Sequence, residues 1–400
     1  MEIKTLKQFA DQINNTVPAR RKLTYSYLAG KGTDKEALAV LKQTIDAIEN
    51  IPRNNNKLKL QIDRSGEIME TEANYEINEL KKDFYFFREG EKQFINFLAG
   101  IHDNFDDQLI EGLRFLNGIQ VTNFITDRDG TVNNYCARYN TSVQSAYNAI
   151  FLSHFSYTVK NAVLVTSAPL KNKGVKDISV FPEKTFILAG SKGREYSNLN
   201  GNEGNFPINP EQQQILNGLS DELHHLVKQP EYAIFYRIGS GLQIKFGQIT
   251  MARQDINHTI TKDQSEQFLE KIRSIVKKVD PQNKHLRIED TGLDIEITLT
   301  TPIDGSKGVK DYDKGDGISF LNKSLTLQLE KGNNLVCGDT SSDLPMLEKC
   351  MELNPQTRAI FVTTDDELIN SVLHICPNSI FVDSPDILIT LLNQKAKEKL

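Results

Sequence analysis

Apolar positions in the first 117 residues recur at helical spacing. One stripe runs from Leu38 to Ile48 and a second from Ile77 to Phe87, at intervals of three and four residues that place them on one face of a helix. Similar patterns occur at residues 3–14, 90–101 and 105–116. The pattern predicts an all-helical N-terminal domain over residues 1–117, and this region contains no cluster of catalytic residue types.

The pattern changes near residue 120, where short β-rich runs begin to alternate with helical segments. Val121–Thr126 and Ala162–Thr166 are two such runs, and a helical segment separates them. The same rhythm returns after residue 305, with apolar runs at 334–337, 358–362 and 380–382. Strands that alternate with helices predict a parallel sheet.

Between these two segments the pattern is that of antiparallel strands. β-rich runs flank Gly239–Ser240–Gly241, and others flank Asp290–Thr291–Gly292. Both glycine-containing segments predict hairpin turns, and a helical pattern at 263–278 lies between them. The sequence therefore predicts an α/β protein in which an α+β cap domain (186–304) is inserted into a Rossmann-like core (120–185 and 305–400).

The charge and composition of the chain exclude some classes of binding partner. The net charge of −6 and the pI of about 5.8 argue against a broad surface for nucleic acid or anionic membrane. The N-terminal residues have no apolar signal core, and no window approaches the roughly 18 consecutive apolar residues of a membrane span. The four cysteines form no CxxC pair, which favours reduced structural thiols. We therefore expect a cytoplasmic protein that binds neither nucleic acid nor membrane.

The clearest chemical signal is Asp127–Arg128–Asp129–Gly130–Thr131, directly after the first predicted strand. Carboxylates at i and i+2 on a loop that leaves the carboxyl end of a parallel strand can converge on one point. Two converging carboxylates need a cation or a shared proton between them. The alternative is an Asx-type turn in which Asp129 and Gly130 only reverse the chain.

Three further fragments follow in the chain. Thr166, with Ser167, ends the second parallel strand, where hydroxyl and backbone N–H groups can hold a phosphate. Lys314 precedes a helix, where an ammonium can neutralise phosphoryl charge. Asp339 and Asp343 follow a later strand and offer oxygen ligands to a hard ion such as Mg²⁺. The alternatives are a strand-end turn, a solvated lysine and a helix N-cap. Together with the Asx-type turn at Asp129 they would make four coincidences in this chain order, which is improbable.

These four elements resemble motifs I to IV of the haloacid dehalogenase superfamily of aspartyl-nucleophile phosphatases, over residues 120–395. The resemblance implies Asp127 as nucleophile and Asp129 as general acid and then general base. It also implies Thr166 and Lys314 as catalytic contacts to the phosphoryl group, and a cap inserted between motifs II and III. The residues predicted at the Mg²⁺ site are Asp127, Asp129, Asp339 and Asp343.

The cap is similar to that of trehalose-6-phosphate phosphatases, particularly the nematode-type group, in which a helical N-terminal region precedes the core. The similarity covers 190–196, the turn at 239–241, the segment 290–296 and the tail from Gly338 to Leu347. Sugar hydroxyls are held well by carboxylates and by cationic forks. The cap residues predicted to bind substrate are Lys192, Arg194, Glu195, Glu289 and Glu296.

The function predicted from the sequence is Mg²⁺-dependent hydrolysis of trehalose 6-phosphate to trehalose and phosphate. Charge offset by the cation and Lys314 would let one carboxylate attack a phosphate dianion. Alternatives are a phosphatase for the phosphate of sucrose, glucosylglycerol or mannosylglycerate, a phosphomutase, and a sugar-phosphate sensor acting through the N-terminal helices. Periodicity leaves open whether these helices pack on the core, contact another protein or form a dimer.

Overall fold

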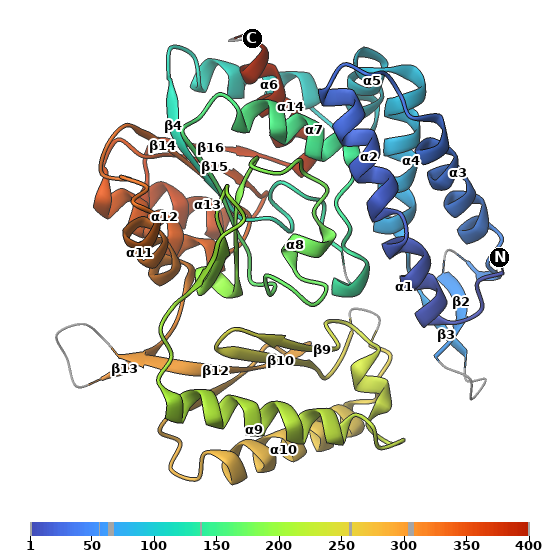
Figure 1. The fold of residues 1–400 in the computed structure, drawn as a ribbon, viewed down its shortest axis with the longest axis vertical. Coiled ribbons are helices and arrows are strands. Elements are labelled where there is room, and N and C mark those ends of the chain that lie inside the picture. Colours follow the sequence, from blue (N-terminus) through green and yellow to red (C-terminus); the bar gives the residue numbers. More distant parts are fainter. Residues whose placement is uncertain are drawn as a thin grey trace.

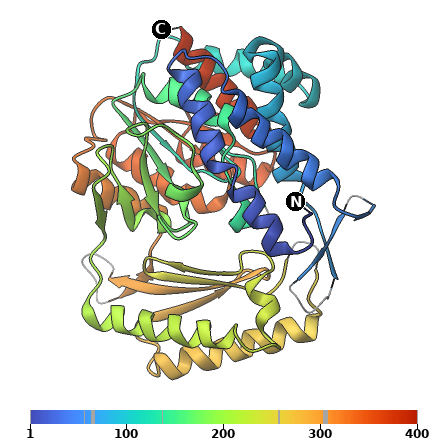
Figure 2. The ribbon, with the colours of Figure 1, turned by 45° about the vertical axis from the view of Figure 1, so that its right-hand side comes forward.

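The computed structural model describes residues 2–55, 57–62, 68–136, 138–255, 258–302 and 308–398. Its α/β core, its α+β insert and its largely helical N-terminal region confirm the predicted fold class. Figures 1 and 2 show the N-terminal helices packed beside the core and the insert below it. Within the described residues, no helix is both long and apolar enough to cross a membrane.

The N-terminal region contains six helices among its described residues. They are α1 (Leu6–Asn14), α2 (Val17–Leu28), α3 (Lys35–Glu49), α4 (Asn74–Glu89), α5 (Glu91–Ile101) and α6 (Phe105–Phe115). The expectation of an all-helical region was wrong in one segment, which forms a small antiparallel sheet of β1 (Arg53–Asn54), β2 (Lys57–Gln61) and β3 (Ile68–Thr71). Leu58 and Leu60 are buried while Lys59 between them is exposed, so the period there is two rather than 3.6.

The core is an eight-stranded sheet in the order β16-β15-β14-β4-β5-β6-β7-β8, parallel from β16 to β6. Its strands are β4 (Val121–Thr126), β5 (Asn161–Val165), β6 (Ile187–Gly190), β7 (Glu195–Ser197), β8 (Glu203–Asn205), β14 (Asn333–Gly338), β15 (Arg358–Val362) and β16 (Ser379–Val382). β6, β7 and β8 lie in the segment expected to belong to the cap. They join the core sheet because β6 pairs with β5, so the division at 186 does not follow the strand pairing.

Helices cover both faces of this sheet. Phe124 and Ile125 are neighbours in β4 yet belong to separate apolar clusters, as the alternation of a strand requires. The Phe124 side is covered by α7 (Ala146–Ser156) and α14 (Pro385–Lys397), and the Ile125 side by α11 (Lys314–Leu325), α12 (Leu344–Leu353) and α13 (Asp366–Ile375). A short helix, α8 (Val175–Ile178), follows β5. This doubly wound arrangement leaves the carboxyl ends of the parallel strands open to the cap.

The cap is an antiparallel sheet with helices on its far side (Figure 1). Its elements are α9 (Pro210–Leu226), β9 (Leu242–Lys245), β10 (Gln248–Ala252), α10 (Lys262–Val279), β11 (Leu286–Asp290), β12 (Asp294–Pro302) and β13 (Val309–Asp311). The hairpin at Thr291–Gly292 agrees with the sequence. The prediction of a hairpin at Gly239–Ser240–Gly241 was wrong. The chain instead reverses at Phe246–Gly247, inside the β-rich run that follows those residues, and so joins β9 to β10.

The strand register gives the cap sheet one apolar face and one polar face. Ile249 and Ile297 are directly paired and buried on the face that packs against α9 and α10. Gln243, Thr250 and Glu296 lie across the strands in the alternate register and form a polar row on the opposite face. Alternation along the strands therefore turns polar side chains toward the core.

Candidate active site

The candidate site lies where three neighbouring parallel strands, β5, β4 and β14, end. Asp127 follows β4, and its backbone N–H donates to the carbonyl of Cys337 in β14 at 3.0 Å. Thr166 follows β5, and Asp339 follows β14. The carboxyl edge of a parallel sheet is where α/β folds bind ligands, and sheet order alone brings these segments together.

Lys314 joins two of the buried carboxylates. It is the first residue of α11, and its Nζ atom donates to Oδ1 of Asp127 at 2.5 Å and also to Oδ1 of Asp343. Both ion pairs are buried. Burial acts to lower the pKa of Lys314, but the charges of Asp127 and Asp343 raise it above its usual range. Lys314 is therefore a fixed cation beside Asp127.

Asp339 completes the acidic group. Its Oδ1 accepts from the hydroxyl of Thr131 at 2.6 Å, and its own N–H donates to Oδ2 of Asp343 at 3.0 Å. Gly130 has φ of +89°, and a Cβ built there would lie 2.1 Å from Oδ2 of Asp339. Glycine is thus required both for the left-handed turn and for the close approach of Asp339.

The acidic group suits a divalent cation. Asp127, Asp339 and Asp343 offer carboxylate oxygens that lie within 4.8 Å of one another. Burial raises the pKa of Asp127 to about 7 despite Lys314, and burial together with the charges of Asp127 and Asp343 raises the pKa of Asp339 to about 8. Three carboxylates share one lysine, so the set has excess negative charge, and oxygen-only ligands are those preferred by a hard ion such as Mg²⁺.

Asp129 is not in the group of carboxylates whose oxygens lie within 4.8 Å of one another, so its expected part in the Mg²⁺ site stays a prediction. Its Oδ1 accepts from the guanidinium of Arg128 and, at 2.9 Å, from the hydroxyl of Ser142. Arg128 also donates to Ser142, both to Oγ at 2.9 Å and to the carbonyl oxygen. The structure therefore holds the Asp129 carboxylate at the edge of a cavity, by a contact to the loop that follows motif I.

This cavity has a volume of about 220 Å³ and includes side chains of both core and cap. Asp127, Asp129, Thr166 and Lys314 all border it. Several other side chains line this cavity, namely Tyr135, Tyr139, Ser142, Ser240, Gln243 and Lys245, and none of them was among the site residues predicted from the sequence. A tyrosine pair after motif I and a lysine at the end of β9, where polar and apolar residues alternate, were the signals that could have indicated them.

Lys245 is a buried cationic residue of the cap that borders this cavity. It lies on β9, is only 8% exposed, and has its pKa lowered mainly by burial and also by Lys192, against the opposing charge of Glu296. Lys192 lies 3.5 Å from Glu296, which also accepts from Gln248 at 2.7 Å. The structure thus brings two of the predicted substrate residues, Lys192 and Glu296, close to Lys245.

None of the five predicted substrate residues borders the cavity that contains Asp127, and three of them also lie away from Lys245. Arg194 is buried over the ring of Tyr312 and donates to the backbone carbonyls of Gly247 and Leu299, the latter at 2.8 Å. Its donors join the core to the cap hairpins. Glu289 is exposed on β11.

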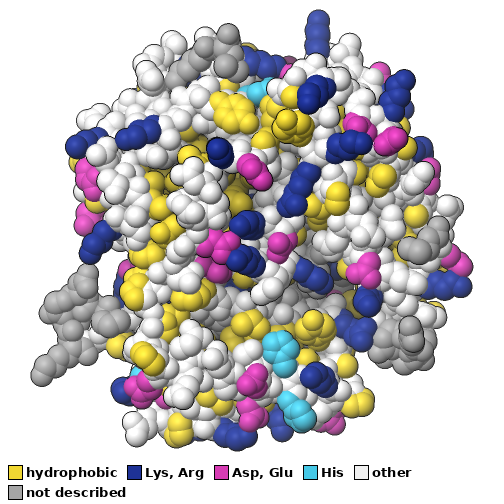
Figure 3. Space-filling model, viewed as in Figure 1, with side chains coloured by type: hydrophobic (Ala, Val, Ile, Leu, Met, Phe, Trp, Pro, Cys, Tyr) yellow, Lys and Arg dark blue, Asp and Glu magenta, His cyan; other side chains and the backbone are white. Residues whose placement is uncertain are grey.

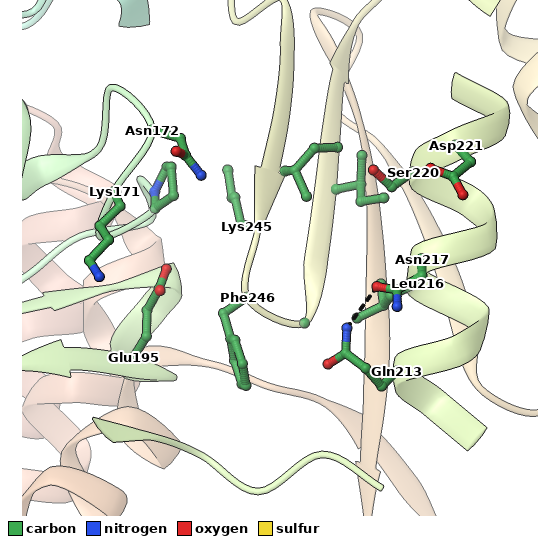
Figure 4. A pocket seen from close by; sticks show the side chains of 14 residues that line it. Lys171, Asn172, Glu195, Gln213, Leu216, Asn217, Ser220, Asp221, Lys245 and Phe246 are labelled. Atoms are coloured by element: carbon green, nitrogen blue, oxygen red, sulfur yellow. Dashed lines mark hydrogen bonds between the residues drawn. The ribbon is translucent and has the colours of Figure 1, made fainter. Parts of the chain in front are cut away.

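Glu195 lies in a second cavity of about 550 Å³ at the edge of β9. Its carboxylate accepts from the N–H of Leu170 at 2.9 Å and from Ser191 Oγ at 2.7 Å. Figure 4 shows Glu195 on the core side of this cavity, α9 on the other side and Lys245 between them. Lys245 borders both cavities, so the two spaces meet at this residue.

Comparisons with known proteins give the family. The model for the C-terminal part of trehalose-6-phosphate phosphatase matches residues 124–388, and the model for the N-terminal helical bundle domain of the same phosphatases matches residues 5–102. The chain belongs to the trehalose-6-phosphate phosphatase family. The resemblance seen in the sequence is thus confirmed, including its nematode-type character.

Members of this family from nematodes are similar over nearly the whole chain. A trehalose-phosphatase of Caenorhabditis briggsae is 30% identical over 422 residues, which cover 96% of this chain and 95% of that protein. A UDP-forming alpha,alpha-trehalose-phosphate synthase 2 of Caenorhabditis elegans is 31% identical over 98% of this chain but only 34% of the synthase. The chain thus spans about a third of the length of the synthase relatives it matches.

Among solved structures, the C-terminal domain of trehalose-6-phosphate phosphatase from C. albicans matches with a TM-score of 0.46 and 13% identity. That match covers 72% of this chain and 96% of the other.

Proposed function

We propose that this family member hydrolyses trehalose 6-phosphate to trehalose and phosphate, through a phosphoryl group carried transiently on Asp127. The observation that carries the proposal is the contact of the buried Asp127 carboxylate with the Lys314 ammonium, beside the acidic group of Asp339 and Asp343. Family membership and the similarity to trehalose-phosphatases support the substrate.

In the first step, an oxygen of Asp127 attacks phosphorus and the bond from phosphorus to the sugar oxygen breaks. Lys314 offsets negative charge on the nucleophile and on the phosphoryl group, and Thr166 at the end of β5 contacts the phosphoryl oxygens. We propose that Asp127, Asp339 and Asp343 hold Mg²⁺, which when bound supplies further charge neutralisation in the buried site. The fixed positions of these groups reduce the reorganisation that attack would otherwise need.

Asp129 is the proton carrier in this proposal. A sugar alkoxide leaves poorly, so a protonated Asp129 donates to the leaving oxygen, and the resulting carboxylate then takes a proton from the attacking water. Water attacks phosphorus, phosphate leaves, and Asp127 returns to a carboxylate. Ser142 and Arg128 keep one oxygen of Asp129 engaged, which leaves the other oxygen to face the cavity.

The cap supplies sugar recognition. Lys245 and Glu296 of the cap and Lys192, which lies between β6 and β7 of the core sheet, form a charged group where the cap meets the core, and we propose that they hydrogen-bond sugar hydroxyls. The cavity of about 220 Å³ is smaller than the roughly 300–1,000 Å³ of typical ligand pockets. We therefore propose that the cap opens to admit a disaccharide phosphate and closes for the reaction.

The test is phosphate release from trehalose 6-phosphate, with and without Mg²⁺, by the wild-type chain and by Asp127→Asn. We expect metal-dependent release in the wild type and a loss of at least about 10⁴-fold in the variant. Sucrose, glucosylglycerol and mannosylglycerate phosphates are the comparison substrates. Preferential release from one of these would reject the trehalose assignment, and unchanged release by Asp127→Asn would reject Asp127 as nucleophile.

A further inference from the structure

One helix of the N-terminal region presents a row of buried and half-buried polar side chains to the core. On α4, Tyr75, Glu76, Glu79, Lys82 and Asp83 are spaced so that they share one helical face, and each contacts the core segment 133–147 or α14. Buried polar groups on a helix face cost free energy unless they are paired. Their pairing shows that this face is matched to the loop that follows motif I.

Two of these contacts reach the immediate support of Asp129. The hydroxyl of Tyr75 donates to the carbonyl of Val143 at 2.8 Å and accepts from Nδ2 of Asn133 at 3.1 Å. Val143 follows Ser142, whose hydroxyl donates to Oδ1 of Asp129 at 2.9 Å. Nδ2 of Asn133 also lies 3.5 Å from the same Asp129 oxygen. The hydroxyl of Tyr75 therefore bonds to Asn133 and to Val143, which lie at the two ends of the loop that supports Asp129.

The rest of the helix fixes the same loop at further points. Glu76 accepts from Arg138 at 2.7 Å and from the hydroxyl of Thr141. Glu79 accepts from Asn134 at 3.1 Å and from Ser145 at 2.7 Å. These charged, buried contacts anchor the backbone of the loop, whereas Tyr75 makes the contact nearest to Asp129.

We propose that Tyr75 is a positioning residue for catalysis: the N-terminal helical region orients Asp129 through the contacts of Tyr75 with Val143 and Asn133. This inference rests on the proposed function of Asp129 as the proton donor to the leaving group. It gives the N-terminal region a part in the chemistry although none of its described side chains lines the cavity that contains Asp127. Misplacement of an acid by a fraction of an ångström is expressed in the rate of the step that it assists.

Leaving-group dependence separates positioning from general destabilisation. A sugar alkoxide requires protonation as it leaves, whereas p-nitrophenolate leaves readily without it. The ratio kcat/KM reports the steps up to the first phosphoryl transfer and not the later hydrolysis. A variant with a misplaced Asp129 should therefore lose kcat/KM for trehalose 6-phosphate and keep most of it for p-nitrophenyl phosphate.

The experiment compares Tyr75→Phe, which removes only the hydroxyl, with the wild type on both substrates. We expect kcat/KM to fall by about 10-fold or more for trehalose 6-phosphate and by less than about 2-fold for p-nitrophenyl phosphate. The matched control is Tyr27→Phe, which removes a hydroxyl that donates to Glu91 at 3.2 Å within the N-terminal helices and should change neither value. An equal fall on both substrates, or no fall on either, would overturn the proposal.

A double variant provides the second readout. If Tyr75 acts through the Ser142 side of the loop, Tyr75→Phe and Ser142→Ala should affect kcat/KM for the sugar phosphate less together than the product of their separate effects. Independent, multiplicative effects would overturn the route through Ser142. Asp127→Asn serves as the reference variant. If it leaves hydrolysis unchanged, the proposed function fails and the positioning role of Tyr75 fails with it. If Asp127→Asn loses activity and Tyr75→Phe does not, only the positioning role is rejected.

Discussion

The Nζ atom of Lys314 lies 2.5 Å from Oδ1 of Asp127, although 187 positions separate the two residues in the chain. The cap is inserted between them, yet β4 and the first turn of α11 meet at the same edge of the sheet. Lys314 is also bound to Asp343, so one ammonium neutralises two buried carboxylates. The charge balance of Asp127 and Asp343 therefore depends on Lys314.

Removal of that charge should be costly for activity. Lys314→Met keeps the length of the side chain but leaves Asp127 and Asp343 without their counter-ion, so we expect kcat to fall by about 10²–10³-fold. Steady-state kinetics at saturating Mg²⁺ measure this, with Lys310→Met, which removes a half-exposed lysine that pairs with Asp313 and Asp316, as the control. Retention of wild-type kcat by Lys314→Met would contradict its role.

Stability should depend on pH and on Mg²⁺ in a linked way. Burial is the main cause that raises the pKa of Asp127 to about 7 and of Asp339 to about 8. Folded pKa values above those of the unfolded chain mean that the stabilising contribution is complete below about pH 4 and is lost as pH rises through about 7 to 8. Without a divalent cation, we therefore expect Tm to fall between pH 5 and pH 9.

Added Mg²⁺ should oppose this loss most strongly at the high end of that range. Binding only to the folded state stabilises it by about 2.7 kcal/mol at a concentration 100 times Kd, which is a shift of several degrees in Tm. Calorimetric scans at each pH measure the shift. Asp339→Asn should reduce both the pH dependence and the response to Mg²⁺; an identical response in the variant would exclude Asp339 from the cation site.

The charged group of the cap should affect sugar recognition more than chemistry. Lys245→Met removes a buried cation that borders the catalytic cavity, so we expect KM for trehalose 6-phosphate to rise about 10-fold or more. Hydrolysis of p-nitrophenyl phosphate, which carries no sugar, should change little. Glu289→Gln is the control, because Glu289 is exposed on β11; a similar rise in KM for both variants would reject the assignment.

A buried ionic cluster should stabilise the junction of the N-terminal helices with the core. Asp386, the second residue of α14, accepts from Lys82 at 2.6 Å, His102 at 2.8 Å and Tyr147 at 2.7 Å. Asp386→Asn leaves Lys82 with Glu79 as its remaining carboxylate partner, so we expect a loss of about 1–3 kcal/mol in the free energy of unfolding, measured with urea.

The pH dependence of this cluster has the opposite sign to that of Asp127 and Asp339. Burial acts to raise the pKa of Asp386, but Lys82, His102 and Tyr147 hold it well below its usual range. The stability it contributes is present above about pH 4 and is lost as pH falls below that value. Asp46→Asn, at an exposed pair with Lys42, should leave unfolding nearly unchanged; an equal loss in both variants would contradict a special role for the cluster.

Local pattern predicted most of the secondary structure because helices and strands bury apolar residues with different periods. The strands at 121–126 and 358–362 and the helix at 262–279 lie close to where the sequence placed them. The predictions of secondary structure and domain boundaries were wrong where the local pattern of residues did not determine how the strands pair. The run at 242–252 contains its own chain reversal. The strands at 187–205 joined the core sheet because β6 pairs with β5, and β7 and β8 extend the sheet from it.

The sequence by itself determined the identity and chain order of the groups at the centre of the site: Asp127, Asp129, Thr166, Lys314, Asp339 and Asp343 follow strand ends or begin a helix, and topology alone brings strand ends together. Tertiary structure decided which charged cap residues border the cavity. Lys245 borders it, Lys192 and Glu296 lie close to Lys245, and Arg194 instead binds backbone carbonyls of the cap hairpins. It also decided that Tyr75 contacts the loop beside Asp129, because a contact across 68 residues depends on how two packed elements meet and leaves no periodic signal in the chain.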